Sequence, residues 1–136
     1  MSAFFDSNIL IYAFSTDLRR ERALTAIAAG GVISVQVLNE FTNVLRKKQK
    51  QEWPVIEAAL LALRFRFPDI VPLTADTHAL ALGFAREHGL AFYDALIVAA
   101  ATEAGCDILY SEDMQHGRAI ADLTIRNPFV ESAQPG

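Results

Sequence analysis

One stretch decides how the chain folds: Ala3-Phe4-Phe5-Asp6-Ser7-Asn8-Ile9-Leu10-Ile11-Tyr12. An apolar run ends on the carboxylate of Asp6, and a second apolar run begins directly after it. This pattern predicts a short buried strand followed by a helix, which either Ser7 or Asn8 caps through a side-chain oxygen. Asp6 then lies at the carboxyl end of a strand, where open α/β sheets bind their ligands. Any other acid that reaches this edge of the sheet would form a site with Asp6.

Length and composition predict one domain. The chain has 136 residues, of which 52% are hydrophobic, which is enough for one well-packed core and too little for two ordinary domains. No internal repeat, low-complexity segment or linker interrupts it. We expect a single domain over residues 1–130 and a C-terminal tail over residues 131–136.

Three features limit the classes of protein to which the chain can belong: its cysteine content, its N-terminus and its charge balance. Cys106 is the one cysteine, and no basic segment leads into an apolar core at the N-terminus, so we expect a cytoplasmic protein. The most apolar run, residues 95–101, is far shorter than the roughly 20 residues that span a bilayer, so no membrane partner is expected. A net charge of −4 argues against a protein that coats nucleic acid. It is compatible with a nuclease whose acids hold cations.

Predicted strands and helices alternate along the chain. Strands are expected at residues 3–5, 32–35, 70–73, 107–110 and 123–125. Helices are expected directly after Asp6, at about 19–29, from 37 into the basic run 46–50, from 53 to 67, from a Thr74 or Asp76 cap to 88, and from the first turn at Asp94 to 103. Residues from Asn127 onward are expected to form a tail. The alternation predicts an α/β fold with a mostly parallel sheet covered by helices on both faces.

Three further acids are placed to reach the edge of the sheet that Asp6 occupies. Asp113 follows a predicted strand, Asp94 begins a buried helix, and Glu40 lies on a helix that follows another strand. Carboxylates about 4 Å apart repel by roughly 4 kcal/mol per pair at an effective dielectric constant near 20, so such a cluster needs a cation. Mg²⁺ or Mn²⁺ prefers oxygen ligands and binds phosphates. Such an ion activates water and stabilises a phosphoryl transition state, which predicts phosphodiester hydrolysis.

Each acid also has a simpler explanation by itself. Asp6 is typical of a turn or a helix cap, and Asp94 is favourable in the first turn of a helix. Glu40 is typical of a solvated helix face, and Asp113 of a loop residue that bonds its own backbone. The metal-site hypothesis therefore depends on all four converging in one fold.

Four segments, in order along the chain, resemble the PIN domain, and specifically the VapC-type toxins of bacterial toxin–antitoxin pairs. They are Phe5-Asp6-Ser7-Asn8, residues 34–41, residues 93–101 and residues 109–114. The resemblance covers nearly the whole chain. It implies a three-layer α/β/α PIN-like fold with a central, mostly parallel sheet. It also implies a metal-dependent endoribonuclease that a cognate antitoxin holds inactive.

The same resemblance assigns roles to residues. It implies that the catalytic and metal-binding acids are Asp6, Glu40, Asp94 and Asp113, supported by the polar side chains of Asn8 and Ser111. Glu112 adjoins Asp113 and is an alternative fourth ligand. The implied cofactor is Mg²⁺, with Mn²⁺ as the alternative, and the implied partners are an RNA substrate, an antitoxin and a second copy of the chain.

Two other groups of residues have open interpretations. The basic cluster either guides an RNA backbone toward the acids or is a solvated helix end; it consists of Arg46, Lys47, Lys48 and Lys50. Aromatic residues outside the four segments could line an exposed apolar groove, where the resemblance implies antitoxin docking; they are Phe14, Trp53, Phe65 and Phe67. The three histidines have no zinc-site spacing and are expected at the surface or in loops.

Other function classes fit less well. A receiver-like phosphoacceptor domain needs a lysine after a late strand, and the chain has no lysine after Lys50. A haloacid-dehalogenase-type phosphatase needs an aspartate two positions after the nucleophile, where this chain has Asn8. The alternative that stays open is a PIN-fold module that binds RNA or protein with little or no catalysis.

Overall fold

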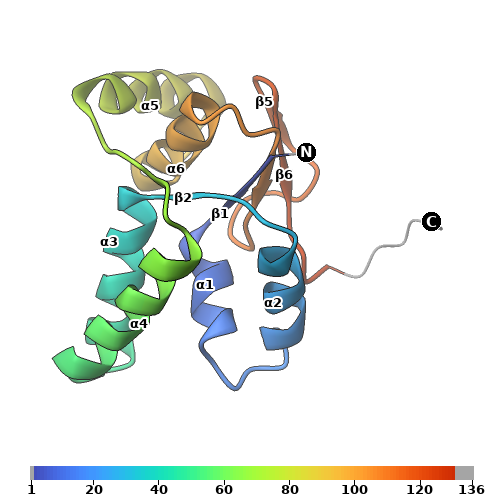
Figure 1. Ribbon diagram of the computed structural model, residues 1–136. Helices are drawn as coiled ribbons and strands as arrows, with labels where there is room; N and C mark the ends of the chain where they lie inside the picture. Colours follow the sequence, from blue (N-terminus) through green and yellow to red (C-terminus); the bar gives the residue numbers. More distant parts are fainter. Residues whose placement is uncertain (1, 131–136) are drawn as a thin grey trace.

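The computed structural model describes residues 2–130, in which strands and helices alternate (Figure 1). The strands are β1 (Ala3–Phe5), β2 (Ile33–Ser34), β3 (Ile70–Val71), β4 (Ile108–Tyr110), β5 (Ala119–Ile120) and β6 (Leu123–Arg126). The helices are α1 (Ser7–Ala13), α2 (Arg20–Ala28), α3 (Val35–Asn43), the π-helix η1 (Val44–Lys48), α4 (Trp53–Arg66), α5 (Ala75–His88) and α6 (Phe92–Glu103). The predicted α/β class is confirmed.

The sheet is parallel except at one edge. Its main part has the order β1-β4-β6-β5, in which β5 alone runs antiparallel to its neighbour. β2 and β3 form a separate parallel pair. Val32 joins this pair to the main sheet, because its amide donates to the carbonyl of Ala3 at 2.9 Å and its carbonyl accepts from the amide of Phe5 at 3.1 Å. The carboxyl ends of β2, β1 and β4 therefore lie next to one another.

Helices cover the strands from two sides. Figure 1 shows α5 and α6 together on one side of β1, and α1 and α2 together on the other. α3 packs against both α1 and α6. The alanine-rich helix α6 is buried along residues 95–101, as its apolar sequence predicts, and its small side chains let the neighbouring elements approach closely. Asp94, in the first turn of α6, lies near the end of β1, since its charge acts on Asp6.

Two predicted boundaries are wrong at helix starts. Neither Ser7 nor Asn8 caps α1, because the helix already begins at Ser7 and Asp6 is the N-cap. Residue 35 is not in a strand, because the Ser34 hydroxyl accepts from the amide of Val37 at 3.3 Å and starts α3. Of the two alternatives for α5, Thr74 is the cap, in a capping box with Thr77.

Several segments differ from their predicted form. The basic run does not end an ordinary α-helix: residues 44–48 form η1. β3 ends at Val71, since Pro72 has no amide hydrogen to continue the ladder. The two-residue strand β5 and its hairpin with β6 were not predicted.

The C-terminal part of the described chain packs against α1 and α2, so a tail from Asn127 onward is wrong up to residue 130. The Phe129 ring meets that of Tyr12 with centroids 5.0 Å apart, and Arg22 donates to the Phe129 carbonyl at 3.3 Å. The predicted tail at 131–136 lies outside the described residues, and the single-domain boundary stays a prediction. Among the described residues, no helix has the length and apolarity needed to cross a membrane.

Gly31 lets the chain pass close to β1. A Cβ at this position would lie 2.6 Å from the carbonyl oxygen of Ala3 and 2.5 Å from the ring of Phe5. The first of these atoms is backbone in a parallel bridge, so it has little freedom to move. Gly83, by contrast, lies inside α5, where an added Cβ would have no neighbouring atom within 4 Å beyond its own stretch of helix backbone.

We therefore expect Gly31→Ala to lower the free energy of unfolding by about 1–3 kcal/mol, as overpacking does. Gly83→Ala should raise it by roughly 0.5–1 kcal/mol, because alanine is the better helix former. Urea unfolding followed by far-ultraviolet circular dichroism measures both. Equal stability of Gly31→Ala and the wild type would contradict the close approach.

Candidate active site

Asp6 is the buried centre of the site. It directly follows β1 and caps α1, and only 2% of its surface is exposed. One carboxylate oxygen, Oδ1, accepts from the Ser7 amide at 2.7 Å and from the Ser7 hydroxyl at 3.5 Å. The other, Oδ2, accepts from the Ser111 hydroxyl at 2.7 Å. Because β4 is the direct neighbour of β1, the residue after β4 reaches the residue after β1.

Glu40 is joined to Asp6 through Ser7. The Ser7 hydroxyl lies 3.0 Å from Oε1 of Glu40 as well as near Asp6. The Gln36 amide, one turn earlier on α3, donates to Oε2 of Glu40 at 3.2 Å. Capping of α3 at Ser34 fixes the helix so that these two residues, four positions apart, face the same side.

Asp113 is held by Asn8. The Asn8 side chain donates through Nδ2 to Oδ2 of Asp113 at 3.0 Å and accepts through Oδ1 from the Glu112 amide at 3.1 Å. The Asp113 amide donates to the Ser111 hydroxyl at 3.2 Å, which in turn bonds Asp6. The loop after β4 is thus attached to the start of α1 through two polar side chains, those of Asn8 and Ser111, that were predicted to support the acids.

The four acids act on one another electrostatically. Burial, together with the charges of Glu40 and Asp94, raises the pKa of Asp6 to about 7 against the lowering effect of its hydrogen bonds. Burial also raises the pKa of Glu40, with added repulsion from Asp94 and Asp113. The pKa of Asp94 is raised by burial and by Asp113. The structure therefore brings all four predicted acids into one region.

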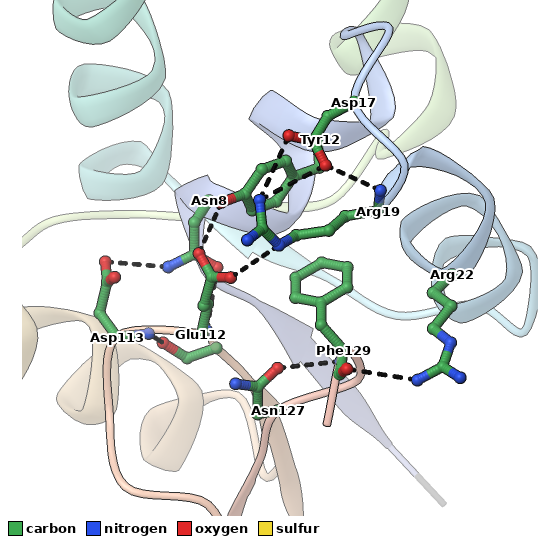
Figure 2. A network of polar contacts seen from close by, with 10 residues as sticks. Asn8, Tyr12, Asp17, Arg19, Arg22, Glu112, Asp113, Asn127 and Phe129 are labelled. Carbon is green, nitrogen blue, oxygen red and sulfur yellow. Dashed lines mark hydrogen bonds and ion pairs between the residues drawn. The ribbon is translucent and has the colours of Figure 1, made fainter. Parts of the chain in front are cut away.

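Glu112 faces a different set of partners from Asp113 (Figure 2). Its Oε1 accepts from the Tyr12 hydroxyl at 2.7 Å, and its Oε2 pairs with Nε of Arg19 at 3.2 Å. The bond to Glu112 is the largest cause that raises the pKa of Tyr12 to about 12. The Arg19 guanidinium also lies over the Tyr12 ring, 4.9 Å from its centroid. Both carboxylate oxygens of Glu112 are thus engaged away from Asp113.

Sequence reasoning missed four side chains that complete these contacts. They are Ser7 as the link between Asp6 and Glu40, Gln36, Tyr12 and Arg19. The spacing of four residues between Gln36 and Glu40 on one helix could have indicated their contact. The other contacts join residues far apart in the chain, for which the sequence has no local signal.

The donor set suits a hard divalent cation. The Ser7 and Ser111 hydroxyls and the carboxylates of Glu40 and Asp94 lie near Asp6, and such oxygen ligands are those that Mg²⁺ and Mn²⁺ prefer. In the part of the chain that the structure describes, no three His, Cys, Asp or Glu side chains are grouped tightly enough to hold one ion directly. Mg²⁺ commonly uses only one or two carboxylates and keeps several waters, so the arrangement fits this ion with water completing its shell.

Comparison with known proteins gives a family and a fold. The family model described as PIN domain matches residues 3–120. No curated protein sequence matches the chain significantly. The family match agrees with the family that the four sequence segments indicate.

Three solved structures share the fold. A toxin–antitoxin complex from Klebsiella pneumoniae has 24% identity and a TM-score of 0.73, covering 94% of this chain and 98% of that one. VapC20 of Mycobacterium tuberculosis, described as a sarcin-ricin loop cleaving toxin, has 23% identity and a TM-score of 0.65, covering 82% and 90%. VapBC2 from Rickettsia felis, bound to a DNA fragment from its promoter, has 18% identity and a TM-score of 0.67, covering 93% and 98%. The predicted PIN-like fold is confirmed.

Burial of Asp6 makes the stability of the metal-free protein depend on pH. Its pKa rises on folding from 3.8 to about 7, so the folded protein keeps a proton that the unfolded chain loses between these values. Stability therefore falls as the pH rises from about 4 to about 7. Above pH 7 the whole of this loss of folding stability is present. Asparagine does not titrate, so Asp6→Asn should exceed the wild type in free energy of unfolding by about 2–4 kcal/mol at pH 8. That difference should shrink toward pH 4.

Urea unfolding in EDTA at several pH values between 4 and 8 measures this difference. The exposed Asp122→Asn is the matched control, because it makes the same chemical change away from the site. A difference between Asp6→Asn and the wild type that does not change with pH would contradict the raised pKa.

Proposed function

We propose that this chain, which belongs to the PIN domain family, is a metal-dependent endoribonuclease and the toxin of a toxin–antitoxin pair. The observation that carries the proposal is the mutual repulsion of Asp6, Glu40, Asp94 and Asp113 around a buried carboxylate. Keeping these acids together costs free energy that a bound cation would offset. Proteins of the same fold include one described as cleaving the sarcin-ricin loop, which supports RNA as the substrate.

In this proposal Asp6 and Asp94 hold the ion, with Glu40 and Asp113 as further ligands directly or through water. When bound, Mg²⁺ or Mn²⁺ supplies an activated water and offsets charge on the phosphoryl transition state. Ser111 and the Ser7 amide orient the Asp6 carboxylate, and Asn8 orients Asp113. Asp6 would hold the ion in its charged form, so at neutral pH it would give up the proton that burial retains.

A second candidate function is a PIN-fold module that binds RNA or protein with little or no catalysis. One observation favours it: among residues 2–130, no three His, Cys, Asp or Glu side chains are grouped closely enough to hold an ion directly. Positioning errors of about 1 Å can cost a hundredfold in rate, so presence of the acids does not by itself establish turnover.

An apolar groove supports the antitoxin as partner. It has a volume of about 700 Å³ between α1, α2 and α4, and its apolar lining includes Phe14, Leu24, Ile27, Leu63 and Phe67. Phe14 is 46% exposed and Leu24 38% exposed, so two large apolar side chains of the groove are open to a partner. Arg20 and Arg66 also line the groove and would suit an antitoxin segment that carries acids beside apolar residues. Of the aromatic residues expected in such a groove, Phe14 and Phe67 line it.

Assembly as a homodimer and a location in the cytoplasm belong to the same proposal. Both rest on resemblance to toxins of this type. Two of the proteins that share the fold are described as toxin–antitoxin assemblies, which supports the antitoxin partner.

Cleavage by the antitoxin-free protein tests the function. We expect a structured RNA pool to be cut with Mg²⁺ or Mn²⁺ and to stay intact in EDTA. Asp6→Asn and Asp94→Asn should fold, as judged by circular dichroism, and should cut at least roughly 100-fold more slowly, because each would remove a metal ligand. Cleavage by either variant at the wild-type rate would show that the assigned site is wrong. If the wild type does not cut but its melting temperature rises with metal, the binding-only module is favoured.

The neighbouring acids after β4 give a second test. Asp113→Asn should reduce cleavage by about tenfold or more, because it removes a charge next to Glu40 and Asp94. Glu112→Gln should reduce it much less, because glutamine still accepts from the Tyr12 hydroxyl. Cleavage rates measured at saturating metal compare the two variants. An equal loss in both would assign a metal-ligand role to Glu112.

A further inference from the structure

Two shallow grooves run from the acids along one face of α3 and join. The first, of about 390 Å³, is lined by Gln36, Asn39, Glu40, Asn43 and Tyr93. The second, of about 410 Å³, is lined by Asn39, Thr42, Asn43, Arg46, Lys47 and Trp53. Asn39 and Asn43 line both, so a continuous surface leads from Glu40 to Trp53. We call it the α3 groove.

The far end of the α3 groove holds a preformed stack of a cation on an aromatic ring. The Arg46 guanidinium lies 4.5 Å from the centroid of the Trp53 ring and donates to the carbonyl of Gln51 at 3.1 Å. The chain turns sharply between Arg46 and Trp53, where Lys50 has a φ of 53°. Trp53 is nevertheless 51% exposed, so much of the ring is open to a ligand. Such a stack needs little ordering when a ligand binds.

Positive charge is concentrated beside this stack. Arg46, Lys47, Lys48 and Lys50 are four of the 12 basic residues in a chain whose net charge is −4. In residues 2–130 the ion pairs are those of Arg19 with Asp17 and Glu112, so the basic cluster makes none there. Four cations within five positions, without carboxylate partners, form a surface that attracts polyanions.

A second aromatic ring lies at the acid end. Tyr93 precedes Asp94, is 64% exposed and lines the groove beside Glu40. Between the two rings the lining is supplied by the amides of Asn39 and Asn43, which both donate and accept hydrogen bonds. The α3 groove thus combines aromatic faces, neutral amides and cations, the groups with which proteins hold unpaired nucleotides.

We propose that the α3 groove binds a single-stranded segment of RNA next to the cleavage site. A base stacks on Trp53, the phosphates lie against Arg46 and Lys47, and Tyr93 stacks a base nearer the acids. This inference rests on the proposed function, because it assigns the nucleotides that flank the bond to be cut. It implies a substrate that is unpaired over the few nucleotides between Glu40 and Trp53.

A second copy of the chain fits the α3 groove less well. In a twofold dimer centred on this surface, the basic cluster of one chain would face the same cluster of the other. Like charges that meet across an interface repel, whereas an RNA backbone neutralises them. Charge complementarity therefore favours RNA as the occupant.

Binding is tested in EDTA, where the proposed cleavage does not occur. Trp53 is the one tryptophan of the chain, so its fluorescence reports on this groove alone. We expect an unpaired oligouridylate or oligoadenylate of eight nucleotides to quench it with saturation, and a blunt RNA duplex to do so more weakly. Anisotropy of the same oligonucleotides carrying a dye gives dissociation constants for variants that lack tryptophan.

Variants separate stacking from charge. Trp53→Ala should weaken binding by about tenfold, and Trp53→Phe by much less, because phenylalanine still offers a ring face. Lys47→Gln should reduce the slope of log affinity against log salt by roughly 1. Phe65→Ala and Arg86→Gln are matched controls, an exposed aromatic residue on α4 and an exposed cation on α5, and should bind as the wild type does.

Three results would overturn the inference. They are no binding by the wild type, wild-type affinity in both Trp53→Ala and Lys47→Gln, or a wild-type dimer that Trp53→Ala converts to a monomer.

Cleavage rates distinguish a failure of the groove proposal from a failure of the nuclease proposal. If Asp6→Asn abolishes cleavage while Trp53→Ala leaves KM unchanged, the nuclease stands and the α3 groove does not bind its substrate. Binding that depends on Trp53 in a protein that never cuts RNA supports the groove and favours the binding-only module.

Discussion

The bond between the Ser111 hydroxyl and the Asp6 carboxylate is the contact around which the other contacts of the site are arranged. It is 2.7 Å long and buried, and it joins the residue after β4 to the residue after β1. A carboxylate 2% exposed has lost almost all of its water, so its hydrogen bonds must come from the protein. The pairing of β1 with β4 supplies Ser111, and the start of α1 supplies the Ser7 amide. The order of the strands therefore determines which side chains can bond the Asp6 carboxylate.

Much of the fold could be predicted because its signals are local. The apolar run before Asp6 and the alanine-rich run after Asp94 indicate a buried strand and a buried helix, and both are present. The β5–β6 hairpin was missed because two residues are too few to show an alternating pattern. η1 was missed because a π-helix has no sequence pattern that separates it from an α-helix. The cap of α1 was misplaced by one or two residues because aspartate, serine and asparagine are all good caps.

The acids themselves could be named from the sequence, but their supporting contacts could not. Ser7 meets Glu40 across 33 positions, and Tyr12 meets Glu112 across 100, so only the fold determines these pairs. Glu112 and Asp113 are adjacent and chemically alike, and the sequence has no means of ranking them. The structure separates them by partner: Glu112 faces Tyr12 and Arg19, whereas Asp113 faces Asn8 (Figure 2).

The main sheet, taken together with the β2–β3 pair that Val32 joins to β1, ends on both sides in strands of only two residues. β5 closes one edge, and β3, followed by Pro72, closes the other. An exposed strand edge is a template for pairing with another chain, and short strands and proline are devices that prevent it. Strand addition across molecules is therefore disfavoured, which protects the sheet from edge-to-edge aggregation while the chain is newly made. A partner of this protein is therefore better held by its helices and loops than by a strand edge.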